Sequence, residues 1–347
     1  MREAFFNIHE LPLVIEPDSD ASVDHLKRWL NKDRDSFLKK FYKYGAVLFR
    51  GFDTNTPKLF EEVTLTVDPN LKNDYLGTSP RDRVPGTEYI FSASELPGYY
   101  PIMQHCEMSY VKQPPVKLFF YCGVEPDYGG ETPICNFRKV YGELDKSIRD
   151  EFDSKGVITV RNYGSVNGGK KFNLWELKKW DEIFLTKDKT EVERKCRENE
   201  IEYEWLPNDN LRLLHRTPAT VKHPITGETT WFNHAQVFHP ASASYEYDQI
   251  HSRQLRFKTL LWSGFLKVMV RMKTMSTKPI DQSMNVLFGD GTAIPDSYLK
   301  HIEDVIWKNI VIFPWKKNDI LAIDNFSTSH GRLPYEGKRR ILVCWSA

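Results

Sequence analysis

The stretch Asp324-Asn325-Phe326-Ser327-Thr328-Ser329-His330-Gly331-Arg332 links two segments that have the composition of buried β-strands. Residues 319–323 precede it, residues 340–345 follow it, and residues 310–313 form a third short apolar run. Turn residues separate the three runs. Short strands joined by turns are typical of an antiparallel barrel or sandwich, so the sequence predicts such a fold with His330 at the rim of a strand.

A second motif, His105-Cys106-Glu107, lies more than two hundred residues before His330. On a strand, His105 and Glu107 point to the same side and Cys106 points to the other. Two imidazoles and one carboxylate suit a divalent iron ion that is bound on one face and open on the other. Each of these residues, taken alone, is more often a structural residue than a metal ligand.

Two adjacent arginines, Arg339 and Arg340, follow His330 shortly before the end of the chain. Antiparallel pairing of neighbouring strands can bring Arg340 near His330, where its planar guanidinium would bind a carboxylate through two hydrogen bonds. The alternative is an arginine in a structural ion pair. Because adjacent residues of a strand face opposite sides, only one of the two arginines is expected to point inward.

The chain has 347 residues, with 48 basic and 47 acidic side chains and a net charge of +1. A charge this small gives no global field that would attract nucleic acid or a membrane surface. The five cysteines are odd in number and form no CxxC pair, which argues against a disulfide framework. The N-terminus lacks an apolar signal segment, and no apolar run reaches the roughly 18 residues that span a bilayer. These features predict a cytoplasmic protein without a membrane span or a nucleic-acid partner.

Apolar spacing predicts helices over 23–44, 56–67 and 138–155, and a charged helix over 179–200. Strands are predicted over 46–49, 116–122, 212–220 and 229–233. The helix over 56–67 is expected to pack on the outside of a sheet. Residues 75–100 are rich in Gly, Pro, Ser and Tyr. A loop of that length in a compact domain is more often a wall or lid of a site than a linker.

Residues 249–280 contain no acidic side chain. Their cations are Arg253, Arg256, Lys258, Lys267, Arg271, Lys273 and Lys278. The favoured interpretation is a partly buried helix with a solvated basic side. A lid helix, a dimer contact and a docking face for an acidic partner are the alternatives.

Over most of its length the chain resembles the taurine dioxygenase and clavaminate synthase-like family of iron(II)- and 2-oxoglutarate-dependent oxygenases. The matching stretches run in family order through residues 45–52, 105–108, 117–122, 129–134, 231–233, 288–291, 314–315, 319–321, 324–325, 330–332 and 339–340. The resemblance implies a single oxygenase domain over 1–347, mainly β with surrounding helices, folded as a double-stranded β-helix (jelly roll). Residues of about 241–285 would be an insertion that acts as a lid or an interaction element.

The resemblance also implies roles for individual residues. His105, Glu107 and His330 would bind Fe(II), with 2-oxoglutarate and O2 as co-substrates. Arg340 would hold the distal carboxylate of 2-oxoglutarate together with Thr132, and Arg339 is the neighbouring candidate. Contacts with the substrate are expected from Trp231, Asn233 and His234, and His234 is expected to line the substrate pocket.

The implied reaction is hydroxylation of an unactivated C–H bond in a small amino-acid-like substrate, free or carrier-bound, with succinate and CO2 as co-products. An acidic carrier domain would suit the basic segment 253–278. The taurine branch has a second arginine four residues beyond the co-substrate arginine, and counting from Arg340 that position is Cys344. A cysteine cannot bind a sulfonate, so taurine is not the expected substrate.

Other functions fit parts of the same pattern. A desaturase or cyclase would use the same scaffold, a zinc hydrolase could use the same two histidines and glutamate, and a non-catalytic jelly-roll protein could bind a small ligand. A further group of histidines, His215, His223, His234 and His239, falls within 25 residues. We interpret this group as structural or surface residues rather than a second metal site.

Overall fold

A computed structural model describes residues 1–347 except 9, 74–80, 94–95, 166–167, 169–178 and 255–256. Within the described residues the largest sheet has seven strands in the order β1-β2-β3-β15-β6-β18-β4. These strands are β1 (Arg2–Phe5), β2 (Leu13–Glu16), β3 (Ala46–Phe49), β15 (Ile320–Asp324), β6 (Lys117–Val124), β18 (Arg340–Ser346) and β4 (Phe91–Ser92). β6, at the centre of the C-terminal part, pairs antiparallel with both β15 and β18.

A smaller sheet faces the large one and has the order β5-β16-β8. Its strands are β5 (Ile102–His105), β16 (Thr328–Arg332) and β8 (Ile134–Asn136). An apolar cluster joins the sheets, with Phe120 of β6, Ile134 of β8 and Val343 of β18 among its buried members. This pair of facing antiparallel sheets is the predicted jelly roll.

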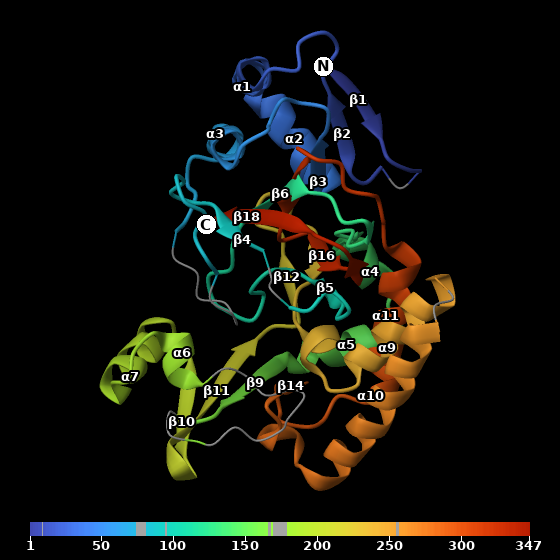
Figure 1. The fold of residues 1–347 in the computed structure, drawn as a ribbon. Coiled ribbons are helices and arrows are strands. Elements are labelled where there is room, and N and C mark those ends of the chain that lie inside the picture. The colour runs from blue at the N-terminus through green and yellow to red at the C-terminus, as the bar shows by residue number, and fades with distance from the viewer. Residues whose placement is uncertain (9, 74–80, 94–95, 166–167, 169–178, 255–256) are drawn as a thin grey trace.

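Three helices cover the outer face of the large sheet: α1 (Val23–Lys32), α2 (Arg34–Tyr44) and α3 (Pro57–Val67) (Figure 1). The predicted helix over 23–44 is therefore two helices, because Asp33 leaves the helical region with a φ of −137°. Gly45 then ends α2 with a φ of 81°, a conformation that favours glycine. A Cβ atom at Gly45 would also collide with Thr328 Oγ1, so the residue must be small.

A second layer lies on the other side of the small sheet (Figure 1). Its sheet has the order β10-β11-β9-β14, formed by β10 (Glu202–Leu206), β11 (Asn210–Thr217), β9 (Val157–Tyr163) and β14 (Met284–Phe288). The helices around it are α4 (Phe137–Glu143), α5 (Lys146–Lys155), α6 (Trp180–Phe184), α7 (Lys189–Glu198), α8 (Ala235–Phe238) and α11 (Asp296–Asn309). Short strand pairs complete the described chain: β7 (Tyr128–Gly129) with β17 (Tyr335–Glu336), and β12 (Thr220–Lys222) with β13 (Thr229–Trp231).

Three sequence predictions need correction in this layer. The helix over 138–155 divides at Leu144, which adopts an extended conformation. The helix over 179–200 divides at Leu185, which has a positive φ of 54°. The strand over 310–313 is reduced to a single bridge between Val311 and Ile134. For the two helical segments local propensity was right over most of the segment, and tertiary contacts set the boundaries, whereas the strand prediction over 310–313 was wrong except at Val311.

Two further helices, α9 (Ser242–Gln254) and α10 (Phe257–Ser276), pack against each other, and α10 lies at the edge of the molecule (Figure 1). The exposed side of α10 is largely apolar, not the solvated basic side that the sequence suggested. In the part of the chain that the structure describes, no helix is both long and apolar enough to cross a membrane.

A buried pair of carboxyl groups joins α9 to α11. Glu246 and Glu303 are both buried, and Trp307 Nε1 donates a hydrogen bond to Glu246 Oε2 at 2.8 Å. Burial raises the pKa of Glu303 well above its ordinary value, and the neighbouring Glu246 raises it further. The raised pKa favours the protonated form of Glu303, in which its hydroxyl group donates a hydrogen bond to Glu246.

We expect this pair to make folding stability depend on pH. The contribution of protonated Glu303 is fully present below its unfolded-state pKa of 4.5 and is lost as the pH rises toward its raised folded-state pKa. Over that window the free energy of unfolding should fall by up to about 1.4 kcal/mol per pH unit. Glu303→Gln keeps a donor without a titrating proton and should flatten this slope in urea unfolding experiments between pH 5 and pH 9. Glu198→Gln, at an exposed helical position, is the matched control, and an unchanged slope in Glu303→Gln would contradict the assignment.

Candidate metal centre

The two histidines are brought together by strand pairing. β5 and β16 run antiparallel, and His105 lies directly opposite His330 in their register. The centroids of the two imidazole rings are 4.3 Å apart. The register shifts just after His330, at Gly331, where a Cβ atom would come within 2.6 Å of the Ile102 carbonyl oxygen. Glycine at this position therefore lets the two histidine-bearing strands approach.

Glu107 reaches the same place by a different route from the one that we expected. β5 ends at His105, so Glu107 lies in the following turn and the predicted strand alternation over 105–107 is wrong. The side chain of Asn325 fixes the turn instead: the Glu107 N–H donates to Asn325 Oδ1 at 2.7 Å, and Asn325 Nδ2 donates to the Glu107 carbonyl at 3.0 Å. Cys106 packs into the apolar core, on the side away from the histidines.

The three side chains form a compact set of possible ligands. One ligand atom from each of His105, Glu107 and His330 lies within 4.8 Å of the others. Glu107 Oε2 is 3.8 Å from His105 Nε2 and 3.6 Å from His330 Nε2. Two nitrogen donors and one oxygen donor at this spacing could hold a divalent ion on one face, and the donor set fits non-haem iron(II).

The charges around the site favour the protonation states that a metal ligand needs, an ionised carboxylate and a neutral imidazole. Burial opposes ionisation of Glu107, but Arg81 and the two imidazoles together lower its pKa well below the ordinary value. Burial and the neighbouring His105 lower the pKa of His330 to about 4. His105 Nδ1 lies 2.9 Å from the Met103 carbonyl oxygen, to which it donates a hydrogen bond, so Nε2 is the nitrogen that faces Glu107. At neutral pH the site thus offers an ionised carboxylate at Glu107 and a neutral imidazole at His330.

Arg81 also belongs to this site, and sequence reasoning missed it. Its guanidinium Nη2 is 3.3 Å from Glu107 Oε2, the oxygen that faces both histidines. Arg81 also lies 5.9 Å from the ring centroid of Trp345. The only signal in the sequence was its location in the loop over 75–100, which we predicted to be a wall of the site.

A pocket for an anionic ligand is indicated by Arg339, not by Arg340 as we expected. Arg339 Nε donates to the Gly130 carbonyl at 2.8 Å, and Nη2 lies 3.4 Å from Thr132 Oγ1. Burial, and next to it the charge of Arg332, lowers the pKa of Arg339 to about 10. In the described part of the chain no carboxylate pairs with this guanidinium. Both arginines line a hollow of about 420 Å³, but Arg340 is exposed and does not contact Thr132.

β18 alternates between two apolar clusters. Ile341, Val343 and Trp345 belong to the cluster between the two sheets, whereas Leu342 and Cys344 belong to the cluster under the outer helices. This alternation does not extend to the two arginines, because Arg339 precedes β18 and the register of β18 with β6 shifts between Arg340 and Ile341. The contacts of Arg339 with Gly130 and Thr132 distinguish it from Arg340 instead.

The three expected substrate contacts have different surroundings. Trp231 is fully buried, packs edge-on against Phe152 and donates its indole N–H to Gln236. Asn233 is also buried and bonds to the backbone at Ala219 and Ala235. Both side chains are structural, because no part of Trp231 is open to a ligand and the amide of Asn233 is already bonded on both sides.

His234 is the member of this group that lies beside the triad. The centroid of its ring is 5.6 Å from that of His105, and its Nδ1 lies 2.7 Å from Ser109 Oγ. Burial and then His105 lower the pKa of His234 well below its ordinary value, so the imidazole is neutral. His234 is therefore a polar, uncharged wall of the site.

The remaining histidines have structural partners. His223 Nε2 is 2.9 Å from Asp324 Oδ2, His215 Nε2 is 2.6 Å from Arg161 Nη2, and His239 Nδ1 accepts from the Ala241 N–H. Among the described residues, a group that could hold a metal ion occurs at His105, Glu107 and His330. His215, His223 and His239 thus have partners within the protein, whereas His234 lies beside the triad.

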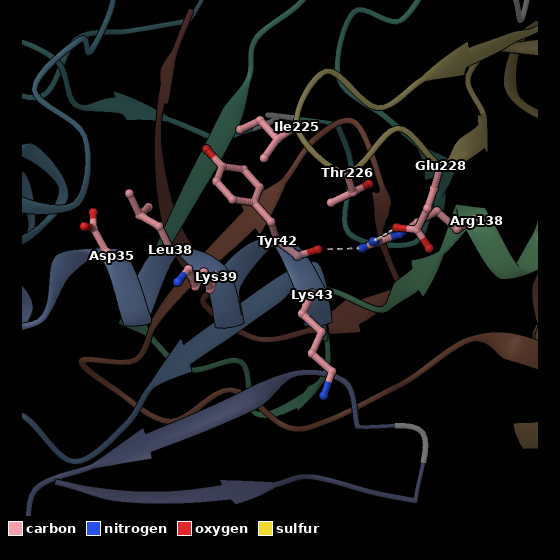
Figure 2. A pocket seen from close by; sticks show the side chains of 9 residues that line it. All are labelled: Asp35, Leu38, Lys39, Tyr42, Lys43, Arg138, Ile225, Thr226 and Glu228. Carbon is pink, nitrogen blue, oxygen red and sulfur yellow. Dashed lines mark hydrogen bonds and ion pairs between the residues drawn. The ribbon is translucent and has the colours of Figure 1, made fainter.

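A larger surface hollow lies away from this centre (Figure 2). Its volume is about 580 Å³, and it lies between α2 and the turn that contains Ile225 and Thr226. Arg138 crosses one end, where it donates to the Tyr42 carbonyl at 3.0 Å and pairs with Glu228 at 2.6 Å. Because Arg138 is already paired here, we interpret the hollow as a seam between a helix and a turn.

Comparison with known proteins gives matches along nearly the whole chain. The family model described as "Taurine catabolism dioxygenase TauD, TfdA family" matches residues 7–345. The "Dapdiamide synthesis protein DdaC" of Enterobacter agglomerans is 31% identical over 333 residues, which is 95% of this chain and 89% of that protein. A "Clavaminate synthase-like protein" of Arabidopsis thaliana is 30% identical over 344 residues, covering 96% of this chain and 92% of that protein.

A solved structure shares the fold at much lower identity. The crystal structure of AAD-2 in complex with Mn(II) and N-oxalylglycine aligns with a TM-score of 0.52 and 13% identity, covering 100% of this chain and 96% of the other. A taurine dioxygenase from Burkholderia xenovorans aligns with a TM-score of 0.50 and 14% identity, covering 96% and 85%. These alignments support the jelly-roll architecture.

The role of Asn325 can be tested through metal affinity. Asn325→Ala removes the amide that fixes the backbone of Glu107, so we expect the affinity for Mn(II) to fall about 10–100-fold, as for other losses of groups that orient ligands. Isothermal titration of Mn(II) under anaerobic conditions measures this change. Asn309→Ala is the matched control, because Asn309 is also buried and hydrogen-bonded but belongs to α11. Equal metal affinity in the two variants would contradict a positioning role for Asn325.

Proposed function

The chain belongs to the taurine catabolism dioxygenase TauD, TfdA family and is an iron(II)- and 2-oxoglutarate-dependent dioxygenase; from this premise we propose that it hydroxylates an unactivated C–H bond of a small amino-acid-like molecule. One observation carries the proposal. A cluster of two imidazoles and one carboxylate shares the jelly-roll interior with Arg339, a guanidinium beside Thr132 without an ion-pair partner in the described residues. A metal and a dicarboxylate would complete these two features.

In this proposal His105, Glu107 and His330 are the iron ligands. Bound iron(II) would supply the redox chemistry that converts 2-oxoglutarate and O2 into succinate, CO2 and an oxidised substrate. The protein holds the ligands in place: β5 and β16 set the spacing of the histidines, and Asn325 holds the turn that carries Glu107. Because these contacts are buried, the ligand geometry exists before the metal binds.

Arg339 and Thr132 would hold the distal carboxylate of 2-oxoglutarate. A desolvated guanidinium gains most from a ligand carboxylate, because charge-assisted hydrogen bonds are strongest where water is excluded. Trp315 Nε1 donates to Thr132 Oγ1 at 3.1 Å, which orients the hydroxyl group so that its proton can point to a ligand. Arg340 does not take part in this proposal.

The proposed substrate class rests on three observations: the sulfonate-binding arginine is missing, two relatives are named for amino-acid-related chemistry, and Arg81 lies at the triad. Four residues beyond Arg339 is Val343, and four beyond Arg340 is Cys344; both are fully buried and neither is cationic, which supports the exclusion of a sulfonate substrate. The relatives named for dapdiamide synthesis and as clavaminate synthase-like support amino-acid-related chemistry. Arg81 supplies a cation at the triad that suits the carboxylate of such a substrate once a metal ion has neutralised Glu107.

We propose a free small molecule rather than a carrier-bound one. Two of the cations over 253–278 that a carrier would need are engaged within the protein: Lys267 pairs with Asp248 at 2.6 Å, and Arg253 donates to the Trp307 carbonyl at 2.6 Å. An acidic carrier domain at this segment stays a prediction.

A zinc hydrolase is the main alternative from another class. It could use the same two imidazoles and carboxylate, but it has no need for a desolvated arginine without an ion-pair partner in the described residues. A non-catalytic binding protein would hold metal and ligand without producing succinate. Dependence of turnover on both 2-oxoglutarate and O2 separates the three functions.

The two adjacent arginines form a matched pair for testing the co-substrate site. Arg339→Ala removes charge-assisted hydrogen bonds to the distal carboxylate, so we expect the Kd for 2-oxoglutarate to rise roughly 100-fold. Arg340→Ala should change the Kd less than about threefold, because an exposed cation contributes little. The intensity of the weak visible band of the anaerobic iron(II)–2-oxoglutarate complex, titrated with 2-oxoglutarate, measures both values. A larger effect from Arg340→Ala would overturn the assignment.

The reaction itself is tested by a substrate screen. Amino acids and their simple derivatives, incubated with enzyme, iron(II), 2-oxoglutarate and O2, should include one that increases succinate release at least about tenfold over the uncoupled background. Mass spectrometry of that substrate should show the gain of one oxygen atom. Loss of two hydrogens instead would identify a desaturase or cyclase, and His105→Ala is the inactive control. Turnover without 2-oxoglutarate would favour the hydrolase.

A further inference from the structure

The outer side of α10 carries an apolar stripe that nothing in the described structure covers. Its five side chains are 45–80% exposed and are Leu261, Phe265, Val268, Met272 and Met275. Their spacing of four, three, four and three residues places them on one side of a helix. Single exposed apolar residues are ordinary on protein surfaces, but a continuous line of five along a helix marks a contact surface.

The opposite side of α10 already has its partner. Ser263, Leu266 and Val270 are buried, and Leu266 packs with Ala243 and Tyr247 of α9 and with Met103 of β5. α10 is therefore apolar on two sides but is covered on one. A helix with apolar residues all round is normally enclosed by protein, so we expect another surface to cover the exposed apolar side of α10.

The spacing of the stripe indicates which kind of partner would pack against it. Alternating steps of four and three residues are the repeat by which one helix packs along another. The positions that flank the stripe are Trp262, Gly264, Met269, Arg271 and Ser276, which include one charge. Two copies of this surface can therefore meet without rows of opposed like charges.

The charges near the stripe argue against the two other kinds of partner. Lys267 pairs with Asp248 of α9 and Lys273 is half-buried, so Arg271 is the exposed cation that remains beside the stripe in the described part of α10 for an acidic protein. A helix that lies on a membrane carries a charged face opposite its apolar one. The corresponding face of α10 is packed on α9.

We propose that the stripe Leu261–Phe265–Val268–Met272–Met275 is the dimer contact of this protein, in which α10 packs along α10 of a second copy about a twofold axis. Covering these side chains in both copies would bury on the order of 1,000 Å², about the minimum for a specific interface. Such an interface is isologous, because the same surface serves in both copies.

The dimer would also support the segment that leads to the metal centre. Trp262, next to the stripe, stacks on Tyr99 with ring centroids 5.5 Å apart, and Tyr247 of α9 donates its hydroxyl to the Tyr99 carbonyl at 2.9 Å. Tyr99 lies shortly before β5, the strand that ends at His105. Dimerisation at α10 would therefore stiffen the approach to one of the proposed iron ligands.

The middle position of the stripe provides a symmetry-specific test. About a twofold axis, Val268 of one copy stays within about one helical turn, 5.4 Å along the helix, of Val268 of the other copy, whichever way the helices run. Val268→Lys and Val268→Glu should each weaken the dimer at least about 100-fold by placing like charges in an apolar contact. An equimolar mixture of the two variants should recover dimers. Sedimentation equilibrium measures the mass of each variant and of their mixture, for comparison with the monomer mass of 40.6 kDa.

Ile225→Lys is the control, because Ile225 is also exposed but lies far from α10 in the hollow of Figure 2. Its dimer affinity should equal that of the unmodified protein. Circular dichroism verifies that the variants are folded, which the exposure of Val268 favours. A monomeric unmodified protein at 100 µM would overturn the proposal, and so would dimers that neither variant weakens or a mixture that stays monomeric. Binding of a monomeric chain to anionic phospholipid vesicles would assign the stripe to a membrane surface instead.

Discussion

The antiparallel pairing of β5 with β16 is the constraint on which the rest of the site depends. It sets His105 directly opposite His330, so two ligands that are far apart in the sequence are held by backbone hydrogen bonds of a buried sheet. The third group, Glu107, lies beyond the end of the strand and needs its own anchor, which Asn325 provides from the end of β15. The two histidines on paired strands and the Glu107 turn held by Asn325 together define a face to which a metal ion can bind without large rearrangement.

The interior also contains two buried charged groups, Glu107 and Arg339. Glu107 is kept ionised by Arg81 and the imidazoles, and Arg339 remains charged although burial lowers its pKa. Burial of either charge costs free energy, which Arg81 offsets in part for Glu107 and which no carboxylate among the described residues offsets for Arg339. A divalent metal and a dicarboxylate would each offset one of these costs. This complementarity is the physical reason why an oxygenase that uses 2-oxoglutarate describes the site better than a hydrolase does.

The helical periphery connects to this centre through a few side chains. Arg332, two residues after His330, donates to the carbonyls of Leu96, Pro97 and Tyr100, and so ties the small sheet to the loop that precedes β5. α9 and α10 press on the same loop through Tyr247 and Trp262. The outer helices are thus connected to the metal centre by a short chain of side-chain contacts.

Local pattern was enough to predict strands over 46–49 and 116–122 and the outer helix over 56–67, because apolar spacing is a property of the sequence itself. The residues of the triad were predicted from ligand chemistry together with the family resemblance. Only tertiary structure decided the rest. The contacts of Arg339 with Gly130 and Thr132 join segments more than 200 residues apart, and the position of Glu107 follows from an amide that is 218 residues away. The exposure of the stripe on α10 follows from which side α9 covers. A sequence determines which side chains can bind a metal or bury a surface. Which of them meet depends on register and packing between segments that are distant along the chain.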